Sequence, residues 1–187
     1  MNLYFRLLLV FCRGLFYTGT ATLNDAVEIN LRVLPSDLDT NLHLSNSLYL
    51  SMMDLARVDL IMRTGLIKHV FKNGWQPMIG NAYLRFRKGL APFEKFKIRS
   101  KIVSWDAKWV YIEQAFISQD RVVAQGLVKG LFCKRGKPIA IKEMFEIMGW
   151  NHYSPEHPQW VEPLVSVDNA VSALNTHLQD SASCTKS

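Results

Sequence analysis

The longest apolar segment of the sequence runs from Leu48 to Ile61 and has the spacing of a helix. Ten of its fourteen residues are apolar. A helix that is apolar on nearly all sides has to be enclosed by other elements. Ser45 is a residue type that caps helices and Gly65 is one that ends them. The pattern therefore predicts one central helix, with a boundary near each of these residues.

Five shorter segments alternate between apolar and polar residues, as strands with one covered face do. One precedes the helix and four follow it, with turn residues between them; they are residues 26–33, 80–88, 95–102, 109–118 and 122–134. One long helix and one antiparallel sheet can bury their apolar faces only if the sheet curls around the helix. The sequence thus predicts an α+β fold in one domain, residues 23–137.

The two ends of the chain differ from this domain. Residues 1–22 form an apolar segment in which Arg6 and Arg13 share one helical face. The opposite face is expected either to make a peripheral membrane contact through residues 1–20 or to pack on the domain. A cleaved signal or a true membrane anchor is the third alternative. Residues 138–180 predict a helical extension with a short amphipathic helix and a weaker one over 165–178. Residues 181–187 are expected to be disordered.

Charge and cysteine content narrow the class of protein. Residues 1–137 carry a net charge of +10 and residues 138–187 a net charge of −4. The basic segment lacks the interleaved aromatic residues of nucleic-acid motifs, so we expect no nucleic acid as partner. Three scattered cysteines favour a reducing, cytoplasmic location over a disulfide framework. Without CxxC, GxGxxG, P-loop or G-x-S-x-G motifs, we expect no metal, no cofactor and no serine nucleophile.

The loop before the central helix holds the groups best suited to chemistry. Asp39, His43 and Asn46 lie just before or at the helix start. Unpaired backbone N–H groups and the helix dipole favour developing negative charge there. A carboxylate beside such an anion site suggests acyl chemistry.

The loop also carries a family motif. The run DLDTNLHLSNSLYL resembles the hotdog-fold acyl-CoA thioesterases of the 4-hydroxybenzoyl-CoA thioesterase type, whose pattern is roughly D-x-x-G-H-x-N-N-x-x-Y. Asp39, His43, Asn46 and Tyr49 match that pattern, whereas Leu42 replaces its glycine and Ser45 its first asparagine. The wider sequence, with RFRKGLAPFEKFKIRSKIVSWDAKW and VKGLF, is more similar to the thioesterase-like branch that includes thioesterase superfamily member six and its bacterial relatives.

The resemblance implies a hotdog fold and hydrolysis of an acyl-CoA or acyl carrier protein thioester. It implies that Asp39 acts as general base or nucleophile, with His43 beside it, and that the backbone N–H at Asn46 polarises the carbonyl. Tyr49 joins the substrate site. Basic residues at a strand end are placed to meet phosphates, namely Arg85, Arg87 and Lys88. Related proteins have sites between subunits, so a homodimer or homotetramer is expected.

Each of these residue groups also has a simpler, purely structural interpretation. Asp39 and Ser45 are residue types that commonly serve only as turn and cap residues. The basic residues around 95–101 suit a solvated strand face. Asp54 and Arg57 on the central helix predict an ion pair, within the chain or across a subunit boundary. The alternative function is a noncatalytic acyl-binding or membrane-associated hotdog protein.

Overall fold

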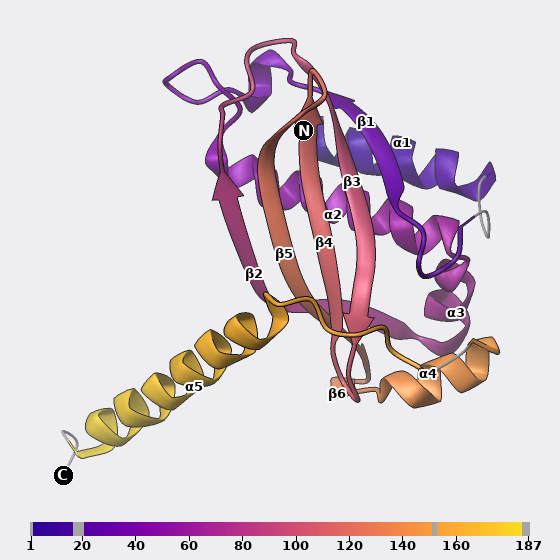
Figure 1. Cartoon of the computed structure of the whole chain (residues 1–187), viewed down its shortest axis with the longest axis vertical. Helices are drawn as coiled ribbons and strands as arrows, with labels where there is room; N and C mark the ends of the chain where they lie inside the picture. The colour runs from indigo at the N-terminus through magenta and orange to yellow at the C-terminus, as the bar shows by residue number, and fades with distance from the viewer. Residues whose placement is uncertain (1, 17–20, 151–152, 185–187) are drawn as a thin grey trace.

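The computed structural model describes residues 2–16, 21–150 and 153–184, and its elements follow the predicted order (Figure 1). The helices are α1 (Asn2–Phe16), η1 (Pro35–Asp37), α2 (Asn46–Arg63), α3 (Leu66–Asn73), α4 (Ile141–Met148) and α5 (Val161–Cys184). The strands are β1 (Val27–Arg32), β2 (Trp75–Phe86), β3 (Lys95–Trp105), β4 (Val110–Ser118), β5 (Arg121–Lys134) and β6 (Lys137–Pro138).

The strands form one antiparallel sheet in the order β1-β3-β4-β5-β2, with β6 paired to the end of β5. Figure 1 shows the sheet curving in front of α2, which crosses its inner face. The close approach of helix and sheet depends on Gly126 of β5, because a Cβ at that position would overlap the side chain of Met53. The predicted α+β arrangement, a sheet around one long helix, is confirmed.

Helix α2 supplies the centre of the core and has the predicted ends. Ser45 is its N-cap residue, and Gly65 follows it with φ 76°. Its buried apolar residues are Tyr49, Met52, Met53, Leu55, Ala56, Leu60 and Met62, and most of them form one cluster with residues of the sheet and with Val10 of α1. Leu50, by contrast, is 44% exposed. The enclosure of α2 is therefore shared between the sheet on one side and α1 on the other.

Helix α1 packs on the domain through the face that carries Arg6. Arg6, Val10 and Gly14 are buried, whereas the large apolar residues of the helix are mostly exposed. Of the expected alternatives, packing on the domain is observed, but the packed face is opposite to the apolar one. An ion pair makes this possible, because Arg6 lies 2.6 Å from the buried carboxylate of Asp37.

Strand β2 begins earlier than predicted and lies at the edge of the sheet. It starts at Trp75, directly after the left-handed Gly74, and pairs with β5 over its length except at a bulge near Gly80. Pro77 lies within it. Proline is tolerated in an edge strand because the missing N–H needs no partner on the open side.

The C-terminal extension contains the two predicted helices with different limits. Helix α4 buries Ile141, Met144 and Phe145 against the lower part of the core. Helix α5 projects away from the body at the lower left of the view, at the end of the sheet opposite to the arrowhead of β2 (Figure 1). It begins at Val161 and continues to Cys184, so it enters the segment expected to be disordered. Pro163 does not stop it, because the first turn of a helix needs no N–H from that residue.

Candidate active site

A tight loop holds the residues that the motif singled out. Leu38 and Leu44 form an isolated antiparallel bridge, and the N–H of Asp39 donates to the carbonyl of His43 at 2.9 Å. The turn closes with a 3.1 Å hydrogen bond from the N–H of Leu42 to the carbonyl of Asp39. Leu42 has φ 55°. The loop is thus a short hairpin that leads directly into α2.

The carboxylate of Asp39 is half-buried and oriented by its own turn. Its Oδ1 accepts the backbone N–H of Asn41 at 2.8 Å and that of His43 at 3.3 Å. Among the described residues, Oδ2 has no protein partner. One carboxylate oxygen is therefore fixed by the fold, and the other is open to a bound molecule.

The imidazole of His43 is held at the same loop. Its Nδ1 lies 2.7 Å from the carbonyl oxygen of Asn41. A carbonyl only accepts hydrogen bonds, so Nδ1 carries the proton and Nε2 of the neutral ring is an acceptor. The ring packs on Gly89, where a Cβ would lie 2.6 Å from Cδ2 of His43. Gly89 therefore allows the ring to lie against the segment that follows β2.

The amino end of α2 has no side-chain cap. Ser45 is the N-cap residue, but its hydroxyl is 2.9 Å from that of Ser47 and caps no backbone group. The first N–H groups of a helix have no partner within the helix. The start of α2 at Asn46 consequently presents backbone donors and the positive end of the helix dipole.

These groups line one small cavity, which we call the loop pocket. Its volume is about 270 Å³. It is lined by Asp39, Asn41, His43, Leu44, Asn46, Tyr49, Phe86, Arg87, Lys88 and Gly89. Six of the seven residues expected in the site thus lie around one cavity.

Arg85 is the exception among the expected residues. Phe86 packs on the buried ring of Tyr49, with ring centroids 5.0 Å apart. Successive residues of a strand face opposite sides of the sheet, so Arg85 faces away from the loop pocket. Arg87 and Lys88 follow the strand end, where both their N–H groups donate to the carbonyl of Val123 at 2.9 and 3.1 Å.

Tyr49 forms the floor of the loop pocket. It is 1% exposed and also packs on Phe116, at a centroid distance of 4.8 Å. Burial raises the pKa of the Tyr49 phenol, so the hydroxyl stays protonated at neutral pH. The Tyr49 side chain therefore does not act as a base, and its hydroxyl is held by a hydrogen bond with the backbone of Leu90.

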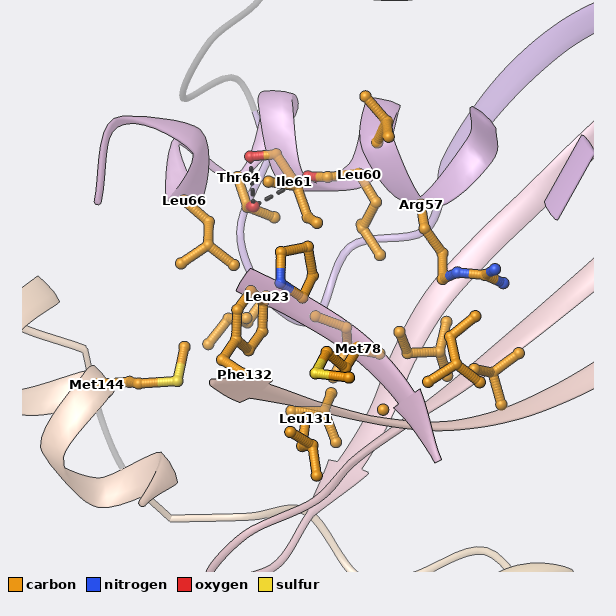
Figure 2. Close-up of a pocket in the computed structure, with 18 of the residues that line it drawn as sticks. Leu23, Arg57, Leu60, Ile61, Thr64, Leu66, Met78, Leu131, Phe132 and Met144 are labelled. Carbon is orange, nitrogen blue, oxygen red and sulfur yellow. Dashed lines mark hydrogen bonds between the residues drawn. The ribbon is translucent and has the colours of Figure 1, made fainter. Parts of the chain in front are cut away.

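A second cavity, which we call the apolar chamber, has no counterpart among the sequence-based predictions. It lies between the C-terminal half of α2, the sheet and α4, and its volume is about 320 Å³. Figure 2 shows aliphatic, aromatic and thioether side chains around it, among them Leu60, Phe132 and Met144. The first half of β2 closes it through Pro77, Met78 and Ile79. Because the lining residues come from seven helices and strands, no local pattern could have indicated the cavity.

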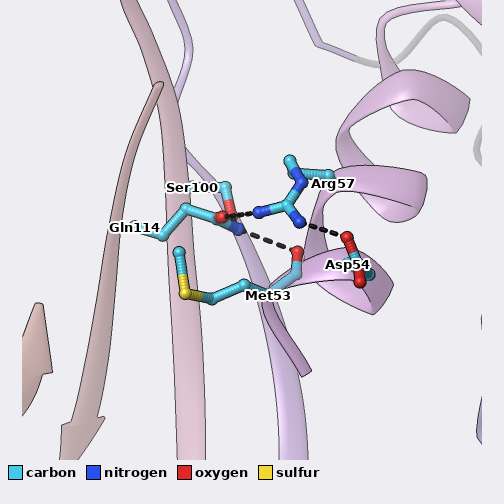
Figure 3. Close-up of polar contacts among 5 residues, drawn as sticks. All are labelled: Met53, Asp54, Arg57, Ser100 and Gln114. Carbon is cyan, nitrogen blue, oxygen red and sulfur yellow. Dashed lines mark hydrogen bonds and ion pairs between the residues drawn. The ribbon is translucent and has the colours of Figure 1, made fainter. Parts of the chain in front are cut away.

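Asp54 and Arg57 lie at the polar end of the apolar chamber. They form the predicted ion pair within the chain, and Arg57 also donates to Oε1 of Gln114 at 2.5 Å (Figure 3). The amide of Gln114 donates to the carbonyl of Met53 at 3.1 Å and to the hydroxyl of Ser100 at 2.9 Å. Burial lowers the pKa of Arg57, and Asp54 opposes the shift. The cluster fixes α2 to β3 and β4.

The family model described as the thioesterase-like superfamily matches residues 33–149. Protein THEM6 of Xenopus laevis is 37% identical over 86 residues, which are 46% of this chain and 42% of that protein. Protein THEM6 of Danio rerio is 35% identical over 117 residues, 60% of this chain and 56% of that protein. The chain thus spans about half the length of these curated relatives.

Solved structures share the fold at low sequence identity. The probable thioesterase YbaW of Escherichia coli has a TM-score of 0.60 at 19% identity, covering 65% of this chain and 95% of that one. The DHNA-CoA thioesterase of Staphylococcus aureus has a TM-score of 0.61 at 15% identity, covering 81% and 94%. The Staphylococcus aureus protein SAV2348, solved in complex with CoA, has a TM-score of 0.58 at 14% identity, covering 74% and 93%. The predicted hotdog fold is confirmed.

Proposed function

The chain belongs to the thioesterase-like superfamily, and from that membership we propose that it hydrolyses an acyl thioester to a free acid and a thiol at the loop pocket. One observation carries the proposal: Asp39, the amino end of α2 at Asn46, Arg87 and Lys88 all line this cavity. Thioester hydrolysis on a CoA substrate needs a base or nucleophile, donors for the carbonyl oxygen and a site for phosphates. The loop pocket contains a candidate for each.

We assign Asp39 as the residue that acts at the carbonyl carbon of the thioester, either as general base or as nucleophile. As general base, its Oδ2 takes a proton from a water molecule whose oxygen attacks the thioester carbonyl carbon. The C–S bond then breaks, and the leaving sulfur takes up the proton. As nucleophile, Oδ2 forms an anhydride as the thiolate leaves, and water opens that anhydride. Both routes place negative charge on the carbonyl oxygen, which the N–H at Asn46 stabilises.

His43 and the cationic residues complete the assignment. Nε2 of His43 can accept a hydrogen bond from the attacking water or exchange a proton with the leaving sulfur. Arg87 and Lys88 suit the phosphates of CoA or the phosphopantetheine of an acyl carrier protein. The fold neighbour solved with CoA supports a CoA substrate. Since Arg85 faces away from the cavity, we leave it out of the phosphate site.

The apolar chamber is the place that we propose for the acyl group, and a dimer connects it to the loop pocket. The two cavities lie at opposite ends of α2 within one chain, with Asn46 and Val58 separated by about 18 Å of helix. In an antiparallel pair of β2 edges related by a two-fold axis, the start of one strand lies beside the end of the other. The chamber of one protomer then lies next to the loop pocket of its partner.

The decisive experiment is release of free thiol from a panel of acyl-CoA and acyl carrier protein thioesters. Asp39→Asn keeps the size of the side chain and its turn hydrogen bonds but removes the base, so kcat should fall at least about a hundredfold. Asp120→Asn is the matched control, because Asp120 lies in an exposed turn at φ 56°, a conformation that asparagine tolerates equally. Full activity of Asp39→Asn would reject the assignment.

A noncatalytic acyl-binding protein is the second candidate, favoured by the hydrogen bonds of Asp39. The two bonds that Oδ1 accepts are those of an ordinary Asx turn, which a purely structural aspartate also makes. This candidate predicts that the wild-type protein binds acyl-CoA, measured by titration calorimetry, without releasing thiol. Thiol release that depends on Asp39 would exclude it.

A further inference from the structure

Helix α1 presents to solvent the side that a helix of a soluble domain normally buries. Its buried positions are Arg6, Val10 and Gly14, with Leu3 partly buried. The outward side is exposed and almost wholly apolar; it carries Tyr4, Phe5, Leu8, Leu9, Leu15 and Phe16, between 46% and 86% exposed. Contiguous exposed apolar surface of this kind marks an interaction site.

The fold holds α1 firmly in this orientation. Arg6 donates to the buried Asp37 at 2.6 Å and to the carbonyl of Arg32 at 2.9 Å. Gly14 lies so close to α2 that a Cβ there would be 2.7 Å from Cε of Met62. Rotating the helix to bury its apolar side would break this buried ion pair. The carboxylate of Asp37 would then be buried without its cation. The contacts of Arg6 and Gly14 therefore keep the apolar face of α1 exposed to solvent in the folded protein.

Helix α3 extends this surface and adds positive charge. Phe71 of α3 is 69% exposed, and its ring meets that of Phe11 edge to face at 6.3 Å. Lys68 and Lys72 of α3 and Arg13 of α1 are exposed nearby. Neither α1 nor α3 contains an acidic residue. The surface thus combines an apolar centre with a basic border.

We propose that α1 and the adjoining end of α3 dock on the surface of a bilayer that contains anionic lipid. A helix with aromatic and leucine residues on one side and basic residues beside them has the composition of an interfacial helix. Anionic headgroups complement the charge of Lys68, Lys72 and Arg13. No helix in the described part of the chain is long and apolar enough to cross a bilayer. Because the Arg6–Asp37 ion pair holds α1 on the domain, the helix lies along the surface of the bilayer with its outward face among the acyl chains.

Cys12 provides a direct probe of this contact. It is exposed, and helical spacing puts it at the centre of the outward face, whereas Cys133 is buried. In a Cys184→Ser background, a polarity-sensitive thiol dye on Cys12 should shift to the blue with vesicles of phosphatidylcholine and phosphatidylglycerol. The same dye on a Val171→Cys, Cys12→Ser variant should not shift, because Figure 1 shows α5 on the opposite side of the molecule from α1.

Vesicle co-sedimentation separates the apolar and charged contributions. Leu8→Glu should weaken binding roughly tenfold or more, and Val171→Glu on the exposed surface of α5 should leave it unchanged. Lys68→Gln with Lys72→Gln should weaken binding several-fold for anionic vesicles only, as should added salt. Unchanged thiol release or thermal unfolding establishes that each variant is folded.

Three outcomes would overturn the proposal. One is absence of vesicle binding by the wild-type protein. Another is equal binding to vesicles with and without anionic lipid. The third is a self-associating wild-type protein that Leu8→Glu converts to a smaller species in sedimentation velocity, which would assign the surface to a second copy of the chain.

Discussion

Leu42 adopts a backbone conformation that leucine rarely takes. Its φ of 55° lies in the left-handed region, and its side chain is 65% exposed. The family pattern has glycine at this position, where no Cβ opposes such a conformation. The loop therefore keeps the glycine-type shape with a residue that is strained in it. The departure from the motif affects the stability of the loop more than its geometry.

The prediction is that Leu42→Gly leaves the protein as stable as the wild type or stabilises it by up to about 1 kcal/mol. Relief of left-handed strain, about 1–2 kcal/mol, exceeds the entropic cost of glycine, about 0.5–1 kcal/mol. Leu42→Ala keeps the strained φ and is the control, expected to gain nothing. Urea unfolding measures both. A Leu42→Gly variant less stable than Leu42→Ala would contradict this account.

At the scale of residues, the motif identified residues that line one cavity more accurately than the charge pattern did. Asp39, His43, Asn46 and Tyr49 all line the loop pocket, because a loop of fixed length joined to a helix start leaves little conformational choice. Arg85 was grouped with Arg87 and Lys88 by proximity in sequence alone. The alternation of the strand separates it from them, and only the position of Phe86 against Tyr49 shows which side faces the site.

Helix α2 carries a buried carboxylate whose titration depends on that burial. Asp59 is 5% exposed and lies 2.9 Å from Nε of Arg63. Burial raises the pKa of Asp59, and Arg63 only partly opposes it. The folded state then binds this proton more tightly than the unfolded state does. The carboxyl therefore contributes stability below its unfolded pKa, and that contribution is lost as the pH rises through its folded pKa.

Asp59→Asn should accordingly become more stable relative to the wild type as the pH rises from about 3 to about 7. Asp25 gives a control of opposite sign, because hydrogen bonds from the N–H and hydroxyl of Thr22 lower its pKa. Its contribution is present above the unfolded pKa and lost as the pH falls through the folded pKa, so Asp25→Asn should lose relative stability over the same rise. Urea unfolding at both pH values tests the pair. If the stabilities of both variants relative to the wild type changed in the same direction with pH, burial would not be the main influence on the pKa of Asp59.

At the scale of elements, local patterns predicted the strands and helices, and long-range contacts decided the rest. The hairpins between β3, β4 and β5 follow from their alternation and turn residues. The orientation of α1 does not, because Arg6 finds its partner Asp37 thirty-one residues away in sequence. The early start of β2 depends on its place at the sheet edge, which permits Pro77. The orientation of α1 and the start of β2 therefore depend on contacts that form only in the complete fold, and a local sequence pattern does not predict them.

At the scale of the whole molecule, the β2 edge of the sheet is exposed and runs from the apolar chamber towards the loop pocket. Strand β2 has Met78, Ile79, Tyr83 and Phe86 between 44% and 53% exposed. An edge strand of this length and composition invites pairing with another strand. Because its start lines the apolar chamber and its end leads into the loop pocket, a two-fold β2 pair would join each chamber to the partner's Asp39. In that arrangement, a chain would have a complete site only when it is paired with a second copy.

Complementation between two inactive variants tests this arrangement. Asp39→Asn removes the carboxylate, and Val58→Phe narrows the chamber without touching the loop pocket. Each homodimer should be inactive on long acyl-CoA substrates. In a co-expressed equal mixture, half of the dimers are mixed and each has one intact site if chamber and carboxylate come from different protomers. About a quarter of the wild-type thiol release should then return.

The same mixture of variants also tests the alternative in which each chain forms a complete site by itself. If each chain uses its own chamber with its own Asp39, every site in a mixed dimer carries one defect and no activity returns. Tyr83→Lys at the β2 edge should weaken the dimer and lower kcat/KM together, because a charged side chain then replaces an exposed aromatic one on the pairing edge. Leu174→Lys, at an exposed position of α5, which projects away from the sheet, should change neither. Full activity of a strictly monomeric Tyr83→Lys protein would mean that one chain contains the complete site.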